Sequence, residues 1–168
     1  TDIDAEDTLY EHNLVVDNEA SGIFHEISFA ATIRWNTVEG NGFGKSSWLW
    51  GAGILVAASA DVDIYENEVA NNADGIAGIQ QVRDDSPRAP HFLENVAIYD
   101  NTIAMSEGQT GVVDDSGHDA VFTDRNIVFT SNTYVGVSGR RFAWDGRLLD
   151  RRGWQATGQD EGAVWIDS

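Results

Sequence analysis

The stretch VDIYENEVANNADGI, residues 62–76, decides the fold of this chain. Apolar residues alternate with polar ones before Asn67, at Val62 and Ile64, and again after it, at Val69. A period of two is typical of short β-strands that turn one side to a core and the other to solvent. The stretch therefore predicts two short strands that meet at a sharp corner.

The same phrase recurs along the chain: a short strand, an asparagine, a second strand, a polar turn, and a glycine followed by apolar residues. The asparagines are Asn13, Asn36, Asn67, Asn101 and Asn132, and the glycines are Gly22, Gly53, Gly75, Gly111 and Gly136. Coils stacked about 4.8 Å apart would place the asparagines in a hydrogen-bonded ladder. Because asparagine tolerates the left-handed backbone conformation, we expect it to make the corner itself. The repeats predict an all-β stack of about five parallel coils. A β-sandwich is the alternative, but its hairpin turns are scarce here.

Composition limits the classes of function. A chain of 168 residues with 42% hydrophobic residues is long enough for one domain and short for two. The net charge of −18 would repel nucleic acid and anionic membranes, so neither is an expected partner. The absence of cysteine excludes disulfides, thiolate metal sites and a catalytic thiol. No apolar run is long enough to span a membrane.

Three phrases carry a resemblance to a known family: LYEHNLVVDNEASGIFHEIS (9–28), VDIYENEVANNADGI (62–76) and VAIYDNTIAMSEGQTGVV (96–113). They resemble the repeats of right-handed parallel β-helix proteins of the pectate-lyase-like superfamily, over residues 9 to about 144. Residues 140–168 resemble the C-terminal closing segment of secreted members, which makes Trp144, Trp154 and Trp165 structural. The opening residues TDIDAEDT (1–8) do not resemble the N-terminal cap of the family. The resemblance implies a single solenoid domain over 1–168, preceding coils of a longer chain, an extracellular location and a polysaccharide partner.

In that family the strands that begin at the repeated glycine line the groove for sugar chains. Alternation predicts that the first and third residues after each glycine face the core, and the second and fourth face solvent. His25 and Asp114 then lie at interior positions, where they need hydrogen-bond partners. Glu26 and Asp115 face outward. We expect His25 and Glu26 to contact substrate, although a satisfied core histidine is the more common alternative.

A polar cluster at the ends of two successive glycine-initiated strands is the predicted catalytic region. Its members are Gln81, Arg83, Asp84, Asp85, Asp114 and Asp115. Neighbouring carboxyl groups raise one another's proton affinity, which separates a general acid from a base or nucleophile. We predict Asp115, Asp114, Asp84 and Arg83 as catalytic residues and Gln81 as a substrate contact. Asp84, Asp85 and Asp115 are a possible Ca²⁺ site, and no other cofactor is expected. A solvated acidic loop explains the same residues without chemistry.

Two tryptophans in the loop GFGKSSWLWG, residues 42–51, complete the predicted site. Trp48 and Trp50 offer flat apolar faces on which sugar rings stack. They could equally fold back as a small core. Two classes of function remain open at this point. The first is a secreted polysaccharide hydrolase or lyase, and the second is a non-catalytic module such as an adhesin, a surface repeat or a structural part of a larger enzyme.

Overall fold

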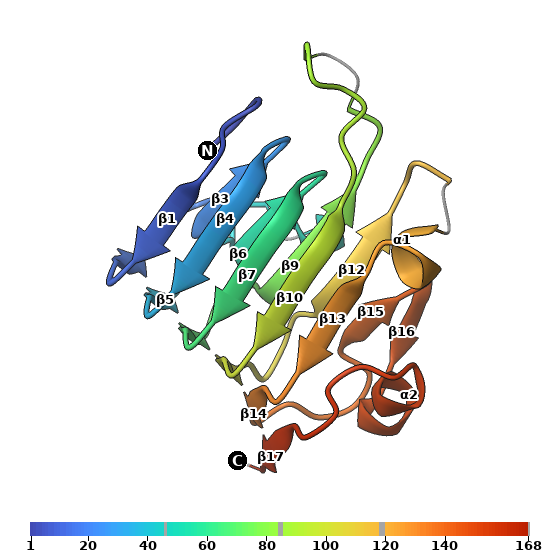
Figure 1. The fold of residues 1–168 in the computed structure, drawn as a ribbon. Helices are drawn as coiled ribbons and strands as arrows, with labels where there is room; N and C mark the ends of the chain where they lie inside the picture. The colour runs from blue at the N-terminus through green and yellow to red at the C-terminus, as the bar shows by residue number, and fades with distance from the viewer. Residues whose placement is uncertain (46, 84–85, 118–119, 168) are drawn as a thin grey trace.

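The computed structural model describes residues 1–45, 47–83, 86–117 and 120–167. Over these residues the chain forms a β-solenoid of about four turns, built from three stacks of strands that we call sheets A, B and C (Figure 1). All neighbouring strands are parallel except β15 and β16. The predicted all-β stack of parallel coils is confirmed.

Up to β15, each pass of the chain adds one strand to each sheet; β16 and β17 then extend sheets C and B. Sheet A contains β1 (Thr8–Glu11), β4 (Phe29–Arg34), β7 (Ala60–Tyr65), β10 (Glu94–Tyr99) and β13 (Ile127–Thr130). Sheet B contains β2 (Leu14–Val16), β5 (Thr37–Glu39), β8 (Glu68–Ala70), β11 (Thr102–Ala104), β14 (Thr133–Val135) and β17 (Val164–Ile166). Sheet C contains β3 (Ile23–Glu26), β6 (Ala52–Ala57), β9 (Asp74–Gln80), β12 (Thr110–Asp114), β15 (Phe142–Trp144) and β16 (Arg147–Leu149). The helical segments are η1 (Ser47–Leu49), α1 (Ala120–Thr123) and α2 (Arg151–Ala156), and none of the helices described could cross a membrane.

The core lies inside the coils. There, residues at equivalent positions of successive strands lie above one another. Ile33, Ile64, Ile98 and Phe129 are aligned on successive strands of sheet A, and all are buried. Between them, Asp63 and its equivalents point outward from the same strands. The alternation read from the sequence therefore sets which face of each strand is buried.

The asparagine ladder is also confirmed, with a correction at the corner. From Asn13 to Asn132, each side-chain amide donates to the Oδ1 atom of the next asparagine at 2.8–3.0 Å. The residue in the left-handed conformation, however, is the one before each asparagine, with φ between 52° and 56°: His12, Trp35, Glu66, Asp100 and Ser131. The expectation that asparagine itself makes the turn is wrong, because its side chain must point inward to reach the next rung.

A second ladder runs along the corner between sheets B and C. Asn18 donates to Asn41, and Asn41 donates to Asn72, both at 2.8 Å. A Cβ atom on the neighbouring Gly53 would lie 2.6 Å from Nδ2 of Asn72, so this repeated glycine is needed for the close approach.

The C-terminal segment closes one end of the stack, as expected. Strand β16 turns back along β15, α2 follows it, and β17 adds to sheet B (Figure 1). Asp160 stands where the next asparagine of the first ladder would lie, and it accepts hydrogen bonds from Asn132 Nδ2, the Tyr134 hydroxyl and Trp154 Nε1. Trp154 is fully buried, so its structural role is confirmed.

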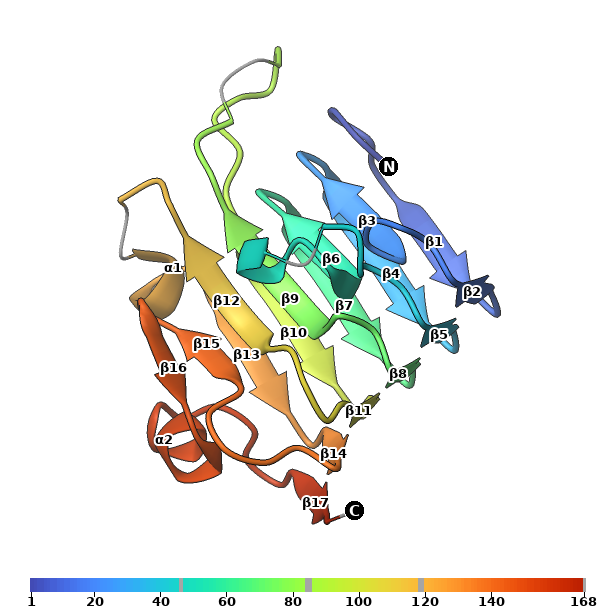
Figure 2. The ribbon, with the colours of Figure 1, turned by 180° about the vertical axis from the view of Figure 1, so that it is seen from behind.

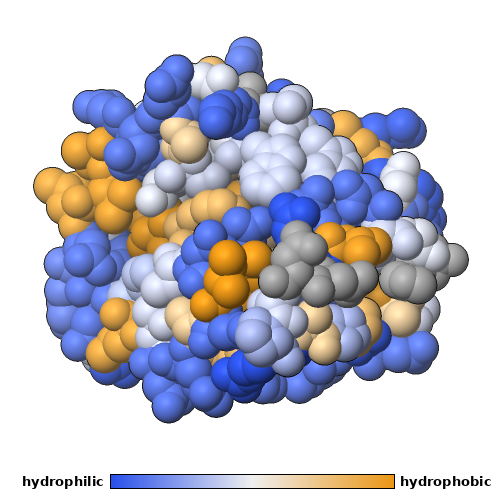
Figure 3. All heavy atoms as spheres, turned by 90° about the horizontal axis from the view of Figure 1, so that it is seen from above, coloured by the Kyte–Doolittle hydropathy of each residue, from blue (hydrophilic) through white to orange (hydrophobic). Residues whose placement is uncertain are grey.

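Between β9 and β10, the described residues 81–83 and 86–93 tie the third pass of the chain to the first. Arg83 pairs with Glu26 at 3.0 Å, and Arg88 pairs with Glu6 at 3.1 Å. Ser86 donates to Asp4 at 3.0 Å. We call these contacts the loop clamp. The face from which this loop projects is mostly hydrophilic, with separate hydrophobic patches (Figure 3).

Candidate functional site

The outer face of sheet C, predicted as the groove, is covered over much of its area. Leu55, Ala57, Ala77 and Ile79 point outward as expected, yet all four are at most 1% exposed. The segment that contains η1 lies in front of β9 and β12 (Figure 2) and buries Leu49 against these side chains. The expectation of an open groove along the whole face is therefore wrong, because the loop's own apolar residue fills it.

The alignment of the fourth coil also differs from the expected one. Gly111 pairs with Ala77, and Asp114 pairs with Gln80, so β12 is displaced by two residues relative to its predicted partners. A shift of two preserves the inward and outward faces of a strand. Asp115 therefore lies beside Gln81 at the strand ends, where an open part of the face remains.

Residues 44, 45, 47 and 50 form a pocket with β3 and the turn before it. Phe24 and Trp50 meet edge to face, with ring centroids 6.0 Å apart. They line a pocket of about 570 Å³ together with Ala20, Ser21, Gly44, Lys45 and Ser47. Trp48, at 38% exposure, is not among the lining residues. Leu49 belongs to the small core on this face, Trp50 packs against that core, and Trp50 also borders the pocket.

A row of hydrogen bonds connects four of the predicted site residues across the ends of the sheet C strands. Arg83 binds Glu26 at 3.0 Å and Gln81 at 2.5 Å. The other end of the Gln81 side chain donates to Asp115 Oδ2 at 3.1 Å. Glu26 lies two residues after Phe24 on the same face of β3. The polar row therefore lies beside the aromatic pocket. Asp115 is exposed at this end of the row.

Asp114 has a different position. Its Oδ1 accepts from the backbone of Ser116 at 3.0 Å, and its Oδ2 accepts from the backbone of Gly117 at 3.1 Å, so the side chain holds the turn after β12. Asp84 and Asp85 lie outside the described residues, and with them most of the possible Ca²⁺ site. Within the described part of the chain, no group of three or more histidine or carboxylate side chains could hold a metal ion.

His25 lies inside the solenoid, as its position in the strand predicted. The side chain is fully buried; its Nδ1 is 2.6 Å from the Thr1 hydroxyl, and its Nε2 has no partner among the described residues. Burial lowers the pKa of His25 to about 4. It therefore faces the core and does not reach the outer face where a substrate would lie.

This burial makes stability depend on pH. Unfolded histidine titrates near pH 6.5 and folded His25 near 4, so between these values the proton binds the unfolded state in preference. The free energy of unfolding is therefore highest above pH 6.5 and decreases as the pH falls towards 4. The loss amounts to about 3 kcal/mol. We expect His25→Gln to unfold in urea with a shallower pH dependence between pH 7 and 4 than the wild type. Equal pH dependences in the two proteins would contradict this assignment.

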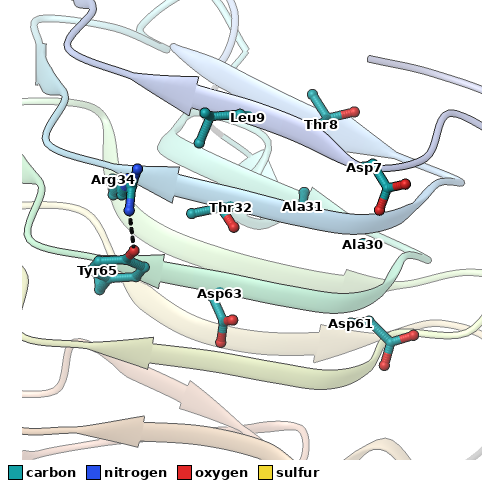
Figure 4. Close-up of a pocket in the computed structure, with 10 residues that line it drawn as sticks. All are labelled: Asp7, Thr8, Leu9, Ala30, Ala31, Thr32, Arg34, Asp61, Asp63 and Tyr65. Carbon is teal, nitrogen blue, oxygen red and sulfur yellow. Dashed lines mark hydrogen bonds between the residues drawn. The ribbon is translucent and has the colours of Figure 1, made fainter.

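A second hollow lies on the outer face of sheet A, over β1, β4 and β7 (Figure 4). Ala30, Ala31 and Thr32 of β4 and Asp61 and Asp63 of β7 are among the residues that line it. Arg34 donates to the Tyr65 hydroxyl at 2.9 Å, which bounds one end of the hollow. Arg34 is also paired with Glu11 at 2.8 Å, and the Tyr65 ring stacks on Tyr99. The Arg34 and Tyr65 side chains are therefore already engaged with neighbouring side chains.

Comparisons of the chain with protein-family models, with curated proteins and with solved structures found no match. The candidate site on the outer face of sheet C has two parts. They are the aromatic pocket between Phe24 and Trp50 and the polar row that ends at Asp115.

Proposed function

We propose that the protein binds an extended polysaccharide on the open part of the sheet C face, as a secreted carbohydrate-active solenoid. The observation that carries the proposal is the pocket between Phe24 and Trp50, which offers apolar ring surface beside the polar groups of Ser21, Lys45 and Ser47. Protein sites for sugars combine aromatic walls with a few placed polar groups in this way. The polar row beside it supplies further hydrogen-bonding groups for the next sugar units.

The charge of the site limits the ligand. Arg83 is paired with Glu26, and Asp115 is exposed at the other end of the row. With a net charge of −18, the protein repels polyuronates unless salt or Ca²⁺ screens the repulsion. A neutral polysaccharide therefore fits the surface better than a uronate.

The binding proposal is tested by Trp50→Ala, with Trp48→Ala as the matched control. Removing the Trp50 ring opens one wall of the pocket, so affinity for oligosaccharides should fall about tenfold or more. Trp48 does not line the pocket, so its replacement should leave affinity unchanged. Isothermal titration calorimetry measures both, and thermal unfolding measures stability in parallel. A loss of stability in Trp50→Ala without a loss of affinity would instead assign the loop a purely structural role.

Cleavage of the bound polysaccharide is a second candidate function, favoured by the polar row. Asp115 is an exposed carboxyl that accepts one hydrogen bond from Gln81, and Arg83 lies at the other end of the Gln81 side chain. A hydrolase would use Asp115 as acid or base, whereas a lyase would use Arg83 as the base. Binding without cleavage corresponds to the non-catalytic module.

A further inference from the structure

The first coil leaves one end of the solenoid uncovered. Its strands β1, β2 and β3 are the last strands of sheets A, B and C among the described residues (Figure 1). The inward-facing residues Tyr10 and Val15 are only partly buried, whereas their partners on the next coil, Ile33 and Val38, are fully buried. We call the surface formed by β1, β2 and β3 the open end.

Both asparagine ladders run in one direction, and both begin at the open end. The backbone N–H and Nδ2 of Asn13 donate to Oδ1 of Asn36, at 3.1 and 2.8 Å. Asn18 donates to Oδ1 of Asn41 in the same way, at 3.0 and 2.8 Å. Within the described ranges, Oδ1 of Asn13 and Oδ1 of Asn18 accept no hydrogen bond, and both side chains are exposed, whereas the later rungs are buried. The open end therefore presents two amide oxygens that lack the donors every later rung receives.

Thr1 already lies in the layer that a further coil would occupy. Its backbone carbonyl accepts from the N–H of Glu26 at 3.1 Å, and its hydroxyl is 2.6 Å from His25 Nδ1 inside the solenoid. His25 pairs with Val56 on the next coil, and Val56 pairs with Gly78 on the coil after that. Thr1 therefore takes the position of Gly78 in a coil stacked on the open end.

A second copy of the chain does not supply the missing donors. Two open ends that met would bring acceptors against acceptors. At the closing end, the first ladder stops at Asp160, whose carboxylate accepts from Asn132 and carries no N–H to donate. Continuation of both ladders instead requires one side-chain amide over Asn13 and another over Asn18.

We propose that the open end is a docking surface for one further parallel coil of the same repeat, recognised through two asparagines five residues apart. The first asparagine donates to Oδ1 of Asn13, and the second donates to Oδ1 of Asn18. The inward apolar residues of the coil cover Tyr10 and Val15, as those of the later coils cover one another. The inference rests on the two ladders and not on the proposed function.

The test joins a duplicate of residues 60–77 directly before Thr1. In this register the copies of Asn67 and Asn72 lie over Asn13 and Asn18. Hydrogen exchange measured by mass spectrometry should show that amides of β1 and β2 exchange about tenfold or more slowly than in the original chain. The matched control carries Asn67→Ser and Asn72→Ser in the added copy only, and should lose most of this protection. A second form with a Gly-Ser linker before Thr1 keeps the test valid if the direct fusion does not fold.

The outcomes separate the possible occupants of the open end. Slower exchange that depends on the two added asparagines supports the docking surface. Added residues that exchange freely, with β1 and β2 unchanged and the melting temperature of the domain retained, would overturn it. Equal protection by the serine control would overturn recognition through the ladders. Light scattering that shows a dimer of the original chain, with β1 and β2 protected only in that dimer, would assign the open end to a second copy and overturn the inference.

Discussion

Asp160→Ala is expected to lower the free energy of unfolding by about 3–6 kcal/mol. Asp160 is fully buried and accepts from Asn132 at 2.9 Å, from Tyr134 at 2.6 Å and from Trp154 at 2.5 Å. Alanine would leave these three buried donors without their acceptor. Asp160 also has a φ of 54°, a conformation that costs alanine about 1 kcal/mol more.

Urea unfolding at pH 7 measures this effect. Asp167→Ala is the matched control, because Asp167 is exposed in the same closing segment and should change stability by less than about 0.5 kcal/mol. Asp160→Asn should lie between the two, since it keeps one oxygen for Asn132 and loses the other. A loss in Asp160→Ala no greater than in Asp167→Ala would show that the network does not hold the closing segment in place.

Asp115→Asn is expected to lower kcat by about 10²–10⁴-fold on any polysaccharide that the protein cleaves. The substitution is nearly isosteric and retains an oxygen that can accept from Gln81, but it cannot transfer a proton. Stability should change little, because Asp115 is exposed. Asp63→Asn removes another exposed carboxyl on the opposite sheet and should leave kcat unchanged.

The assay distinguishes the two reactions. New reducing ends report hydrolysis, and the absorbance of an unsaturated product reports elimination, each measured with and without Ca²⁺. Elimination that is abolished by Arg83→Ala and untouched by Asp115→Asn would move the base to Arg83. A wild-type protein that binds a polysaccharide but cleaves none would be a non-catalytic module.

The fold could be predicted because its determinants repeat in the sequence. Asn67 and its equivalents set one corner, and the alternation around Ile64 sets the buried face. The second ladder was missed, although Asn18, Asn41 and Asn72 each follow a first-ladder asparagine by five residues. That fixed spacing is the signal that could have revealed it.

The candidate site was less predictable because it depends on loops without a repeat. The outward face of sheet C was identified correctly, and the structure joins Gln81, Arg83 and Asp115, which the sequence places in one cluster. The contact of Arg83 with Glu26 was not predicted. The burial of Leu49 over that face follows from how one irregular loop packs, which no periodicity encodes.

The loop clamp has a consequence for cooperativity. In a linear stack each coil contacts only its neighbours, so the terminal coil can fray while the others remain folded. Here Arg83 and Arg88 reach from the third pass of the chain to Glu26 and Glu6 at the beginning. Opening the first coil must therefore break contacts that belong to the third. The clamp therefore couples local melting of the first coil to the loss of contacts with the third.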